Sequence, residues 1–233
     1  MLPRAGGYAG AMSPDPDTLA ETSADAGGTA LATVVRALAA VRPAAKPFHP
    51  RGTVLRGLLT RHGGAEPSGV PWLDEAGEDE VLVRLSRAVG LPRPLPDIFG
   101  LALRVPGARD GRPSDLLLAT TGQAVPTRFL LTWHREGHQR VFTSLLPYRS
   151  ATGPVVLGAR RTSDEHYELA WARPTGDWTV FGRLTLDEEP GDDEPVSFDP
   201  VEHPLPGLDN YDWVRRLRRP SYLVARRSSG RPE

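Results

Sequence analysis

Hydrophobic positions after residue 50 recur in short runs, and each run is closed by glycine, proline or charged turn residues. The runs are leucine-rich or β-branched and five to eight residues long, which is typical of β-strands. About eight such runs in roughly 135 residues predict an all-β barrel or sandwich. The predicted strands span Thr53–Leu59, Val81–Ser86, Ile98–Val105, Asp115–Thr121, Arg128–Trp133, Val155–Ala159, Tyr167–Ala172 and Thr179–Leu186.

The two ends of the chain show different patterns. Residues 1–28 are small, polar and interrupted by glycine and proline, so we expect a disordered N-terminal arm. Near the C-terminus a helix-like segment, Asn210–Arg227, follows a proline-rich connector, Phe198–Leu208. We therefore expect a mainly β fold with flanking helices (α+β), built as one domain over residues 29–229. The first predicted helix ends before Pro43 and has an apolar face made of Leu31, Val34, Val35, Leu38 and Val41.

Charge is unevenly distributed, although the 233 residues sum to a formal net charge of -1. Asp187–Glu194 contains six carboxylates, and a solvated loop explains them better than a metal site because nothing fixes a ligand geometry. A nucleic-acid-binding tail would use the arginines of the last helix, but the acidic run balances them, so no nucleic-acid partner is expected. Those arginines are Arg215, Arg216, Arg218, Arg219, Arg226 and Arg227.

The composition excludes several kinds of chemistry. No cysteine is present, which excludes disulfides, thiolate nucleophiles, cysteine-ligated zinc, iron–sulfur clusters and thiolate-ligated haem. No apolar stretch approaches the roughly 18–20 residues of a membrane-spanning helix, and no secretory signal is visible, so a cytoplasmic location is expected. Lys46 is the only lysine among 28 basic residues, and the excess of arginine is typical of a GC-rich genome.

Most catalytic motifs are missing from the sequence. It contains no Gly-x-Ser-x-Gly, no Walker loop, no dinucleotide fingerprint and no His-Glu-x-x-His. His134 and His138 have the spacing of zinc ligands on one helical turn, but Gly137 and the lack of a third ligand nearby speak against a metal site. A haem-independent hydrolase that uses His49 with carboxylates is a further alternative, although neither a metal set nor a nucleophile motif accompanies it.

A set of short strings follows a fixed order along the chain, and two of them, Asp-Ile-x-Gly-x-Ala-Leu and Ser-x-x-Pro-Tyr-Arg, are specific in combination. In this order the sequence resembles the haem catalase family, including shortened catalase-related proteins and the allene oxide synthase branch. The resemblance extends from about Lys46 to Arg227. The strings are Phe48–Gly52, Val83–Gly90, Asp97–Arg104, Asp115–Thr121, Phe142–Arg149, Phe181–Leu186, Phe198–Pro200 and Arg218–Tyr222.

The resemblance implies an eight-stranded antiparallel barrel, with haem b held between the barrel wall and a C-terminal helix. His49 corresponds to the distal histidine, whose imidazole takes a proton from a peroxide and returns it to the departing oxygen. Ser86 corresponds to the serine that orients this imidazole. Arg84 is similar to an arginine that pairs with a haem propionate.

The resemblance also implies a proximal ligand. Tyr222 matches the tyrosine that binds haem iron as phenolate. A free phenol has a pKa near 10, so ligation at neutral pH requires the iron charge and a cationic neighbour. Arg218, one helical turn earlier, matches the arginine that supplies this charge.

The sequence departs from the family at the distal side. The family's asparagine should fall near Ala119 or Thr120, and its arginine three residues before the histidine is Lys46 here. We therefore expect a haem-dependent oxidoreductase, peroxidase-like or acting on an organic hydroperoxide, rather than an efficient catalase. The alternative is a haem-free binding or scaffold protein with the same fold. The expected partner is a small peroxide or hydroperoxide, and a monomer or homodimer is expected.

Overall fold

The computed structural model describes residues 52–92, 94–135, 139–190 and 196–215, with side chains up to residue 187 in the last strand. The predicted N-terminal arm and its helix lie outside the described residues. Of the predicted C-terminal helix, residues 212–215 are helical, Asn210 and Tyr211 are not, and residues 216–227 lie outside the described residues. Within the described residues no helix has the length and apolarity needed to cross a membrane.

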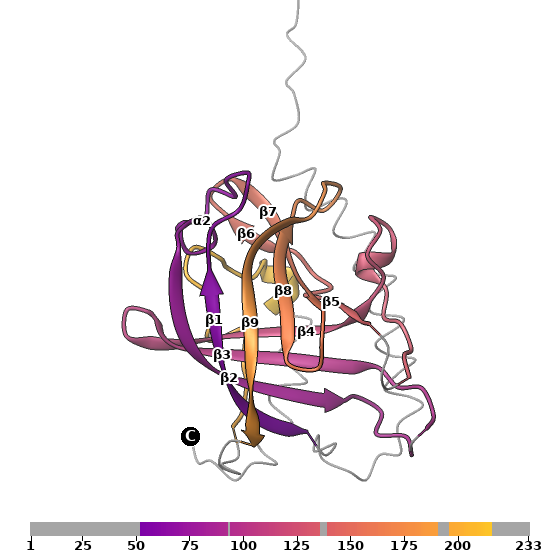
Figure 1. The fold of residues 1–233 in the computed structure, drawn as a ribbon. Helices are drawn as coiled ribbons and strands as arrows, with labels where there is room; N and C mark the ends of the chain where they lie inside the picture. Colours follow the sequence, from indigo (N-terminus) through magenta and orange to yellow (C-terminus); the bar gives the residue numbers. More distant parts are fainter. Residues whose placement is uncertain (1–51, 93, 136–138, 191–195, 216–233) are drawn as a thin grey trace, which may run out of the picture. The chain divides into compact units, whose positions relative to one another are not determined.

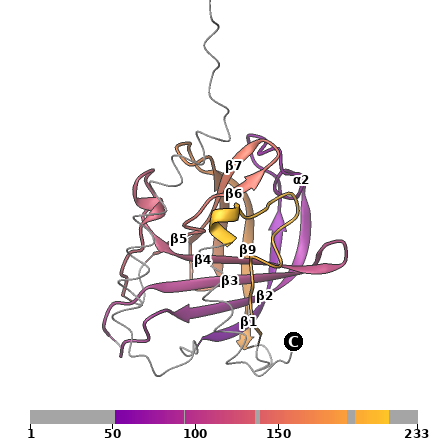
Figure 2. The same ribbon diagram turned by 180° about the vertical axis from the view of Figure 1, so that it is seen from behind.

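The strands form an antiparallel barrel (Figures 1 and 2). Around the ring the order is β5, β4, β3, β2, β1, β9, β8 and β7, and β5 pairs with β7 to close it. Within the described residues eight strands thus form the ring, as predicted, and β6 pairs with the start of β7. The strands are β1 (Thr53–Arg61), β2 (Gly77–Arg87), β3 (Phe99–Arg109), β4 (Arg112–Thr121), β5 (Val141–Thr143), β6 (Tyr148–Ser150), β7 (Gly153–Arg161), β8 (His166–Ala172) and β9 (Thr179–Pro190).

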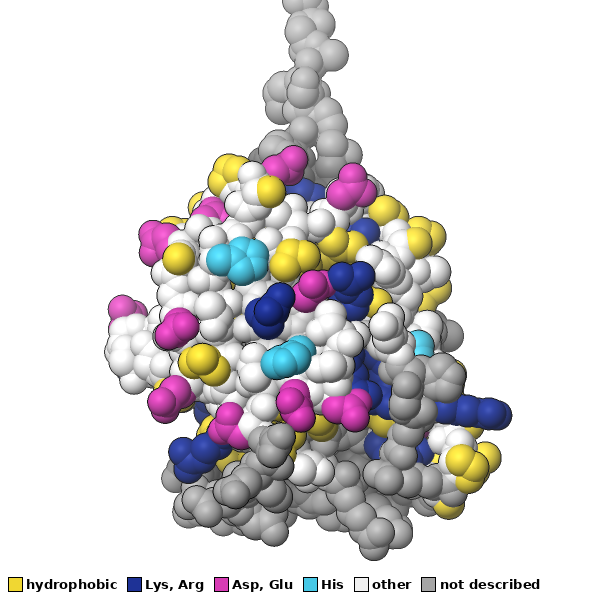
Figure 3. Space-filling view, in the orientation of Figure 1, with side chains coloured by type: hydrophobic (Ala, Val, Ile, Leu, Met, Phe, Trp, Pro, Cys, Tyr) yellow, Lys and Arg dark blue, Asp and Glu magenta, His cyan; other side chains and the backbone are white. Residues whose placement is uncertain are grey.

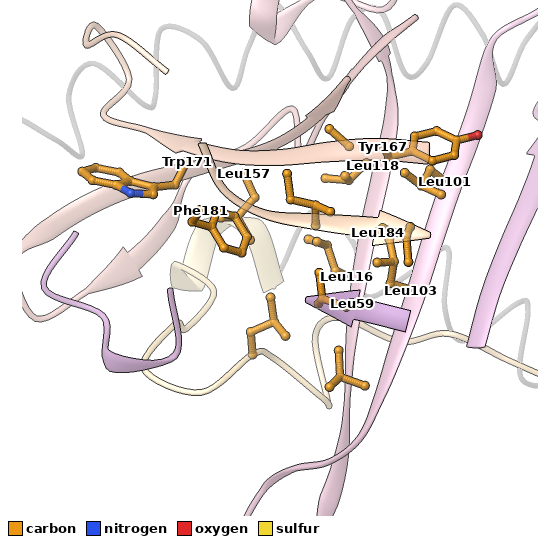
Figure 4. Packing of buried hydrophobic residues seen from close by; sticks show 14 of the residues in the cluster. Leu59, Leu101, Leu103, Leu116, Leu118, Leu157, Tyr167, Trp171, Phe181 and Leu184 are labelled. Carbon is orange, nitrogen blue, oxygen red and sulfur yellow. The ribbon is translucent and has the colours of Figure 1, made fainter. Parts of the chain in front are cut away.

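Alternation along each strand places large apolar side chains inside the barrel. The register sets Leu59 opposite Leu184 and Leu101 opposite Leu118, and each of these side chains is at most 3% exposed. Figure 4 shows them packed with the aromatic ring of Phe181. Full burial of one such side chain is worth roughly 1.5–3 kcal/mol. Because side chains fill the interior, a ligand site must be sought on the outside of the barrel or in its loops.

Side chains of loops close the end of the barrel at which β1 ends and β2 begins. The short helix α2 (Pro71–Asp74) begins with a proline, which suits the first turn of a helix. It buries Trp72 and Leu73 in the same cluster as the strand residues. The connector after β9 adds Leu205 and Leu208 to this cluster. The connector is therefore part of the core rather than a loose linker.

Arginine side chains close the opposite end of the barrel. The guanidinium carbon of Arg140 lies 3.6 Å from the ring centroid of Phe99, and that of Arg87 lies 5.6 Å from the same centroid. Cations over an aromatic face gain electrostatic energy that grows when water is excluded. Both guanidinium groups thus pack against Phe99 at this end of the core.

The predicted strand Arg128–Trp133 is wrong. It begins in a 3-10 turn, η1 (Thr127–Phe129), and its later part makes only isolated bridges, within the described residues. Arg128 is 2% exposed and donates hydrogen bonds to the backbone oxygens of Arg173 and Gly176. Because these oxygens lie on the loop between β8 and β9, the segment turns toward that loop instead of continuing as a barrel strand.

Two short strands take the place of the missing one. β5 completes the ring and β6 pairs with the start of β7, and each is three residues long. Such short strands contain too few positions for a period of two to be visible in the sequence.

The turn of the β3–β4 hairpin lies away from the ring and is exposed, with Asp110 and Gly111 at φ values of 50° and 76°. Asparagine, aspartate and glycine tolerate this conformation best.

Tyr167 lies inside the barrel, 2% exposed, and burial raises the pKa of its hydroxyl group above the ordinary 10.0. The nearby Arg161 and Arg140 oppose this shift. A raised pKa in the folded state gives stability that is complete below the unfolded pKa and is lost as pH rises through the folded pKa. We expect urea unfolding to show a fall in stability as the pH rises above the ordinary tyrosine pKa of 10.0, and this fall should be smaller in Tyr167→Phe. Identical pH dependence in both proteins would contradict this expectation.

Candidate functional site

One part of the outer faces of β2, β3 and β4 carries small and apolar side chains around Arg84. We call this surface the outer patch; the register places Arg84 beside Ala102 and Leu117, and Ser86 beside Gly100 and Ala119. All six residues are half-buried. The outside of a small barrel that faces water normally carries polar side chains. The outer patch therefore has the composition of a surface that binds an apolar group.

Arg84 is the cationic group of the outer patch. Its Nε atom is buried and has no hydrogen-bond partner among the described residues. A Cβ atom at Gly52 would lie 2.7 Å from this Nε, so glycine makes room for the arginine at the start of β1. A buried donor without a partner costs about 1–3 kcal/mol. An anionic group of a ligand bound to the patch would remove this cost.

Ser86 lies over Gly100 on the neighbouring strand. A Cβ atom at Gly100 would come within 2.6 Å of the Ser86 Oγ atom, so only glycine leaves the hydroxyl group where it is. Thr53 pairs with Leu85, and the chain therefore enters β1 beside the outer patch. His49 lies outside the described residues, four positions before Thr53. The structure brings Arg84 and Ser86 together on one face and leaves the position of His49 open.

The two positions at which the family's asparagine was expected, Ala119 and Thr120, face opposite sides of the barrel wall. Thr120 points inward and is fully buried; its Oγ1 donates to the backbone oxygen of Thr132 and accepts from the backbone N–H of Phe99. Ala119 is the residue that shares the outer face with Ser86 and Gly100. Thr120 therefore has a structural role, and the outer patch has no side-chain hydrogen-bond donor at Ala119.

The Asp-Ile-x-Gly-x-Ala-Leu string has a structural explanation. Asp97 is fully buried, and its carboxylate accepts backbone N–H groups of the loop after β2 and the Nε–H of Arg87. Gly100 admits the Ser86 hydroxyl group, and Ala102 keeps the patch flat beside Arg84. The sequence analysis singled out this string but assigned no role to its two small residues, although their alternation with large side chains indicated an outward face.

The Ser-x-x-Pro-Tyr-Arg string forms the turn after β5 and the first two residues of β6. The Ser144 hydroxyl group donates to the backbone oxygen of Leu146 and accepts from the backbone N–H of Leu157. Tyr148 is 3% exposed in the core, and the backbone of Arg149 pairs with that of Asp209. The string thus shapes the barrel and supplies no group to the outer patch.

A buried ion pair fixes the connector to the barrel wall. Asp115 has a side chain 0% exposed, and Arg104 donates to both of its carboxylate oxygens at 2.7 Å. The same carboxylate accepts the backbone N–H of Asp199, and Arg104 also donates to the backbone oxygen of Ser197. The connector then leads to the helical residues 212–215. Arg218 and Tyr222 follow directly and lie outside the described residues.

His134, another candidate residue, has local partners in the described part of the chain. His134 Nε2 lies 2.9 Å from the Oγ1 of Thr132, and its backbone pairs with that of Asp97. His138 lies outside the described residues. Within the described part of the chain no group of three or more histidine, aspartate or glutamate side chains is placed to hold a metal ion.

Comparisons with known proteins give no match: no family model fits the chain, and no curated protein is significantly similar to it. The resemblance to haem catalases therefore depends on the ordered strings and on the proposed roles of the residues. The outer patch combines small and apolar side chains with the buried Nε of Arg84, features that suit a ligand with an apolar body and an anionic group.

Replacing Gly100 with alanine tests the packing of the outer patch. The new methyl group would push the Ser86 hydroxyl group aside, which we expect to cost about 1 kcal/mol of unfolding free energy. Adding Ser86→Ala removes the conflict, so the double variant should regain most of the loss. Urea unfolding of Gly100→Ala, Ser86→Ala and the double variant gives the coupling free energy between the two side chains. Strictly additive effects would show that the two side chains do not interact.

Proposed function

We propose that this chain binds haem b on the outer patch and acts as a peroxidase-like enzyme or transforms an organic hydroperoxide. The observation that carries the proposal is the buried Nε of Arg84, which has no partner among the described residues and lies on a small-residue apolar surface. Haem combines a flat apolar ring with carboxylates. The patch offers both complementary features.

The residues of the patch fit this group. Gly100, Ala102 and Ala119 have the smallest side chains and so let a flat ring approach the backbone of two adjacent strands, β3 and β4. Leu117 adds apolar contact, and Arg84 would pair with a propionate. The filled barrel interior supports a site on the outer wall rather than inside.

The remaining roles are carried by residues beyond the described ranges. Tyr222 would bind the iron as phenolate, and Arg218 would hold the phenol deprotonated. His49 would accept and return a proton at an imidazole nitrogen, with Ser86 fixing the ring from the other nitrogen. The bound haem would supply the oxidising chemistry. The connector fixed by Asp115 leads the chain toward Arg218 and Tyr222.

The side chains around Ser86 favour an organic substrate. Ala119 offers no hydrogen bond where an amide would help to polarise hydrogen peroxide. An alkyl group of an organic hydroperoxide gains from contact with an apolar wall. We therefore favour organic hydroperoxides over hydrogen peroxide as substrates.

An absorption spectrum of protein made with haem precursor tests the proposal. We expect a Soret band in the wild type and in His49→Ala, and its loss in Tyr222→Phe. Arg84→Leu should weaken hemin binding about tenfold or more, because a charge-assisted hydrogen bond is worth roughly 1.5–3 kcal/mol. Arg183→Leu, which removes an exposed arginine of β9, should leave hemin binding unchanged.

Hydroperoxide turnover tests the proposed role of His49. His49→Ala should keep the Soret band and lose at least about 100-fold in hydroperoxide turnover, the usual contribution of a general acid–base. A wild-type protein that stays colourless and shows no spectral change on hemin titration would refute haem binding. That result would favour the haem-free binding protein with the same fold.

A further inference from the structure

Two polar side chains on the outer face of β2 each lie across a glycine next to that strand. The Nε and Cγ atoms of Arg84 would lie 2.7 and 3.3 Å from a Cβ atom at Gly52, which directly precedes β1. The Oγ atom of Ser86 lies over Gly100 of β3. Because β1 and β3 pair with opposite edges of β2, the two polar groups of the outer patch lean apart. The Arg84 Nε lies on the β1 side and the Ser86 hydroxyl group on the β3 side.

Arg84 differs from the other arginines that are buried or half-buried in the described residues. Exposed arginines also meet acids: near the centre of Figure 3 basic side chains lie beside acidic ones, and Arg160 of β7 pairs with Glu168 of β8. Arg84 has no such partner among the described residues, so no ion pair within them explains its position. The other buried or half-buried arginines each donate at least one hydrogen bond to a carboxylate or a backbone oxygen; they are Arg61, Arg87, Arg104, Arg128, Arg140, Arg161 and Arg173.

Gly52 determines where the Arg84 side chain lies. A methyl group at position 52 would take the space that the arginine occupies, and it would also lie 3.0 Å from the backbone oxygen of Leu85. Since this oxygen belongs to a paired strand, the arginine is the group that must give way. An arginine held in one place loses less side-chain freedom when it binds an anion. The glycine therefore prepares Arg84 for an anionic ligand.

We propose that Gly52 is the positioning residue through which the outer patch selects ligands that carry a carboxylate. A planar guanidinium donates two parallel hydrogen bonds to a carboxylate, whereas an ester has no charge to match it. With Arg84 held on the β1 side, the carboxylate lies there, and the apolar body of the ligand lies over Ala102 and Leu117 of β3 and β4. This selection rests on the proposed function, because it concerns the same patch.

Hemin and its dimethyl ester, which lacks both carboxylates, test the selection. We expect the wild type to bind hemin at least about tenfold more tightly than the dimethyl ester in absorbance titrations. In Gly52→Ala this ratio should fall to about two or less, because Arg84 no longer meets the carboxylate in its prepared position. Arg84→Leu should give the same low ratio. The double variant Gly52→Ala/Arg84→Leu should lower it no further, since Gly52 acts through Arg84.

Proton exchange at the Arg84 Nε gives a readout that needs no haem. In NMR spectra this N–H signal, identified by its loss in Arg84→Leu, should exchange slowly with water in the wild type because the atom is buried. In Gly52→Ala it should exchange at least about tenfold faster. The matched control is Gly77→Ala, whose methyl group would meet the Arg61 guanidinium at the far end of β2. It should change neither the exchange rate of Arg84 nor the preference for hemin.

The outcomes distinguish this selection from haem binding itself. A wild type that binds neither compound refutes haem binding and the selection together. A wild type that binds hemin and the ester equally, or a Gly52→Ala variant that keeps the wild-type ratio, overturns the selection and leaves haem binding in place. Equal weakening of both compounds in Gly52→Ala also keeps the ratio, and it would show that Gly52 has only a structural role.

Discussion

Asp115→Asn will lower the free energy of unfolding by about 3 kcal/mol, because removal of one partner of a buried ion pair leaves the other uncompensated. The Asp115 carboxylate is 0% exposed and accepts both Arg104 donors and the backbone N–H of Asp199. An asparagine amide would direct its own N–H groups at one of these donors. Urea unfolding measures the loss, and limited proteolysis should show early cleavage of the connector.

The matched control is an exposed pair on the barrel wall. Arg160 and Glu168 form an ion pair with side chains 53% and 27% exposed, so Glu168→Gln should change stability by less than about 1 kcal/mol. An Asp115→Asn/Arg104→Met variant should recover part of the loss, since no buried charge remains alone. If Asp115→Asn costs no more than Glu168→Gln, the connector is not held by this pair.

Arg128→Met will destabilise the fold by a similar amount, about 3 kcal/mol. The methionine fills the space but leaves the backbone oxygens of Arg173 and Gly176 without their donors. The guanidinium group also lies 4.6 Å from the ring centroid of Trp178. Burial lowers the pKa of Arg128 below its ordinary value, which reflects the cost of this site for a cation.

Two further variants identify what Arg128 contributes. Arg128→Lys keeps the charge but cannot donate in two directions from a planar group, so it should recover less than half of the loss. Arg183→Met removes an exposed arginine of β9 and should stay within about 0.5 kcal/mol of the wild type. Full recovery by lysine in urea unfolding would show that charge alone matters at this position.

The barrel could be predicted because its long strands repeat a visible pattern. β2, β3 and β4 each bury side chains at every second position, and most of these are large and apolar, so a period of two is visible without any knowledge of the partner strands. The prediction was wrong at Arg128–Trp133 because a buried arginine determines a turn there through contacts 45 and 48 residues away. β5 and β6 depend on pairing with β7, which local sequence does not encode.

The candidate site could be predicted only in part. Arg84 and Ser86 do lie on one face, whereas the choice between Ala119 and Thr120 needed the register of β3 against β4. The small residues that make the patch flat, Gly100 and Ala102, carry no functional group and so gave no chemical signal. The roles of His49, Arg218 and Tyr222 stay predictions.

The exposed turn of the β3–β4 hairpin makes the protein suitable for labelling. A Cβ atom at Gly111 would meet nothing within 4 Å, so a short peptide tag inserted between Asp110 and Gly111, beyond the last paired residues Arg109 and Arg112, should leave both strands paired. This turn lies at the opposite end of β3 and β4 from the loops that carry Leu95 and Trp133. A fluorophore attached there would follow the tumbling of the barrel without touching these loops.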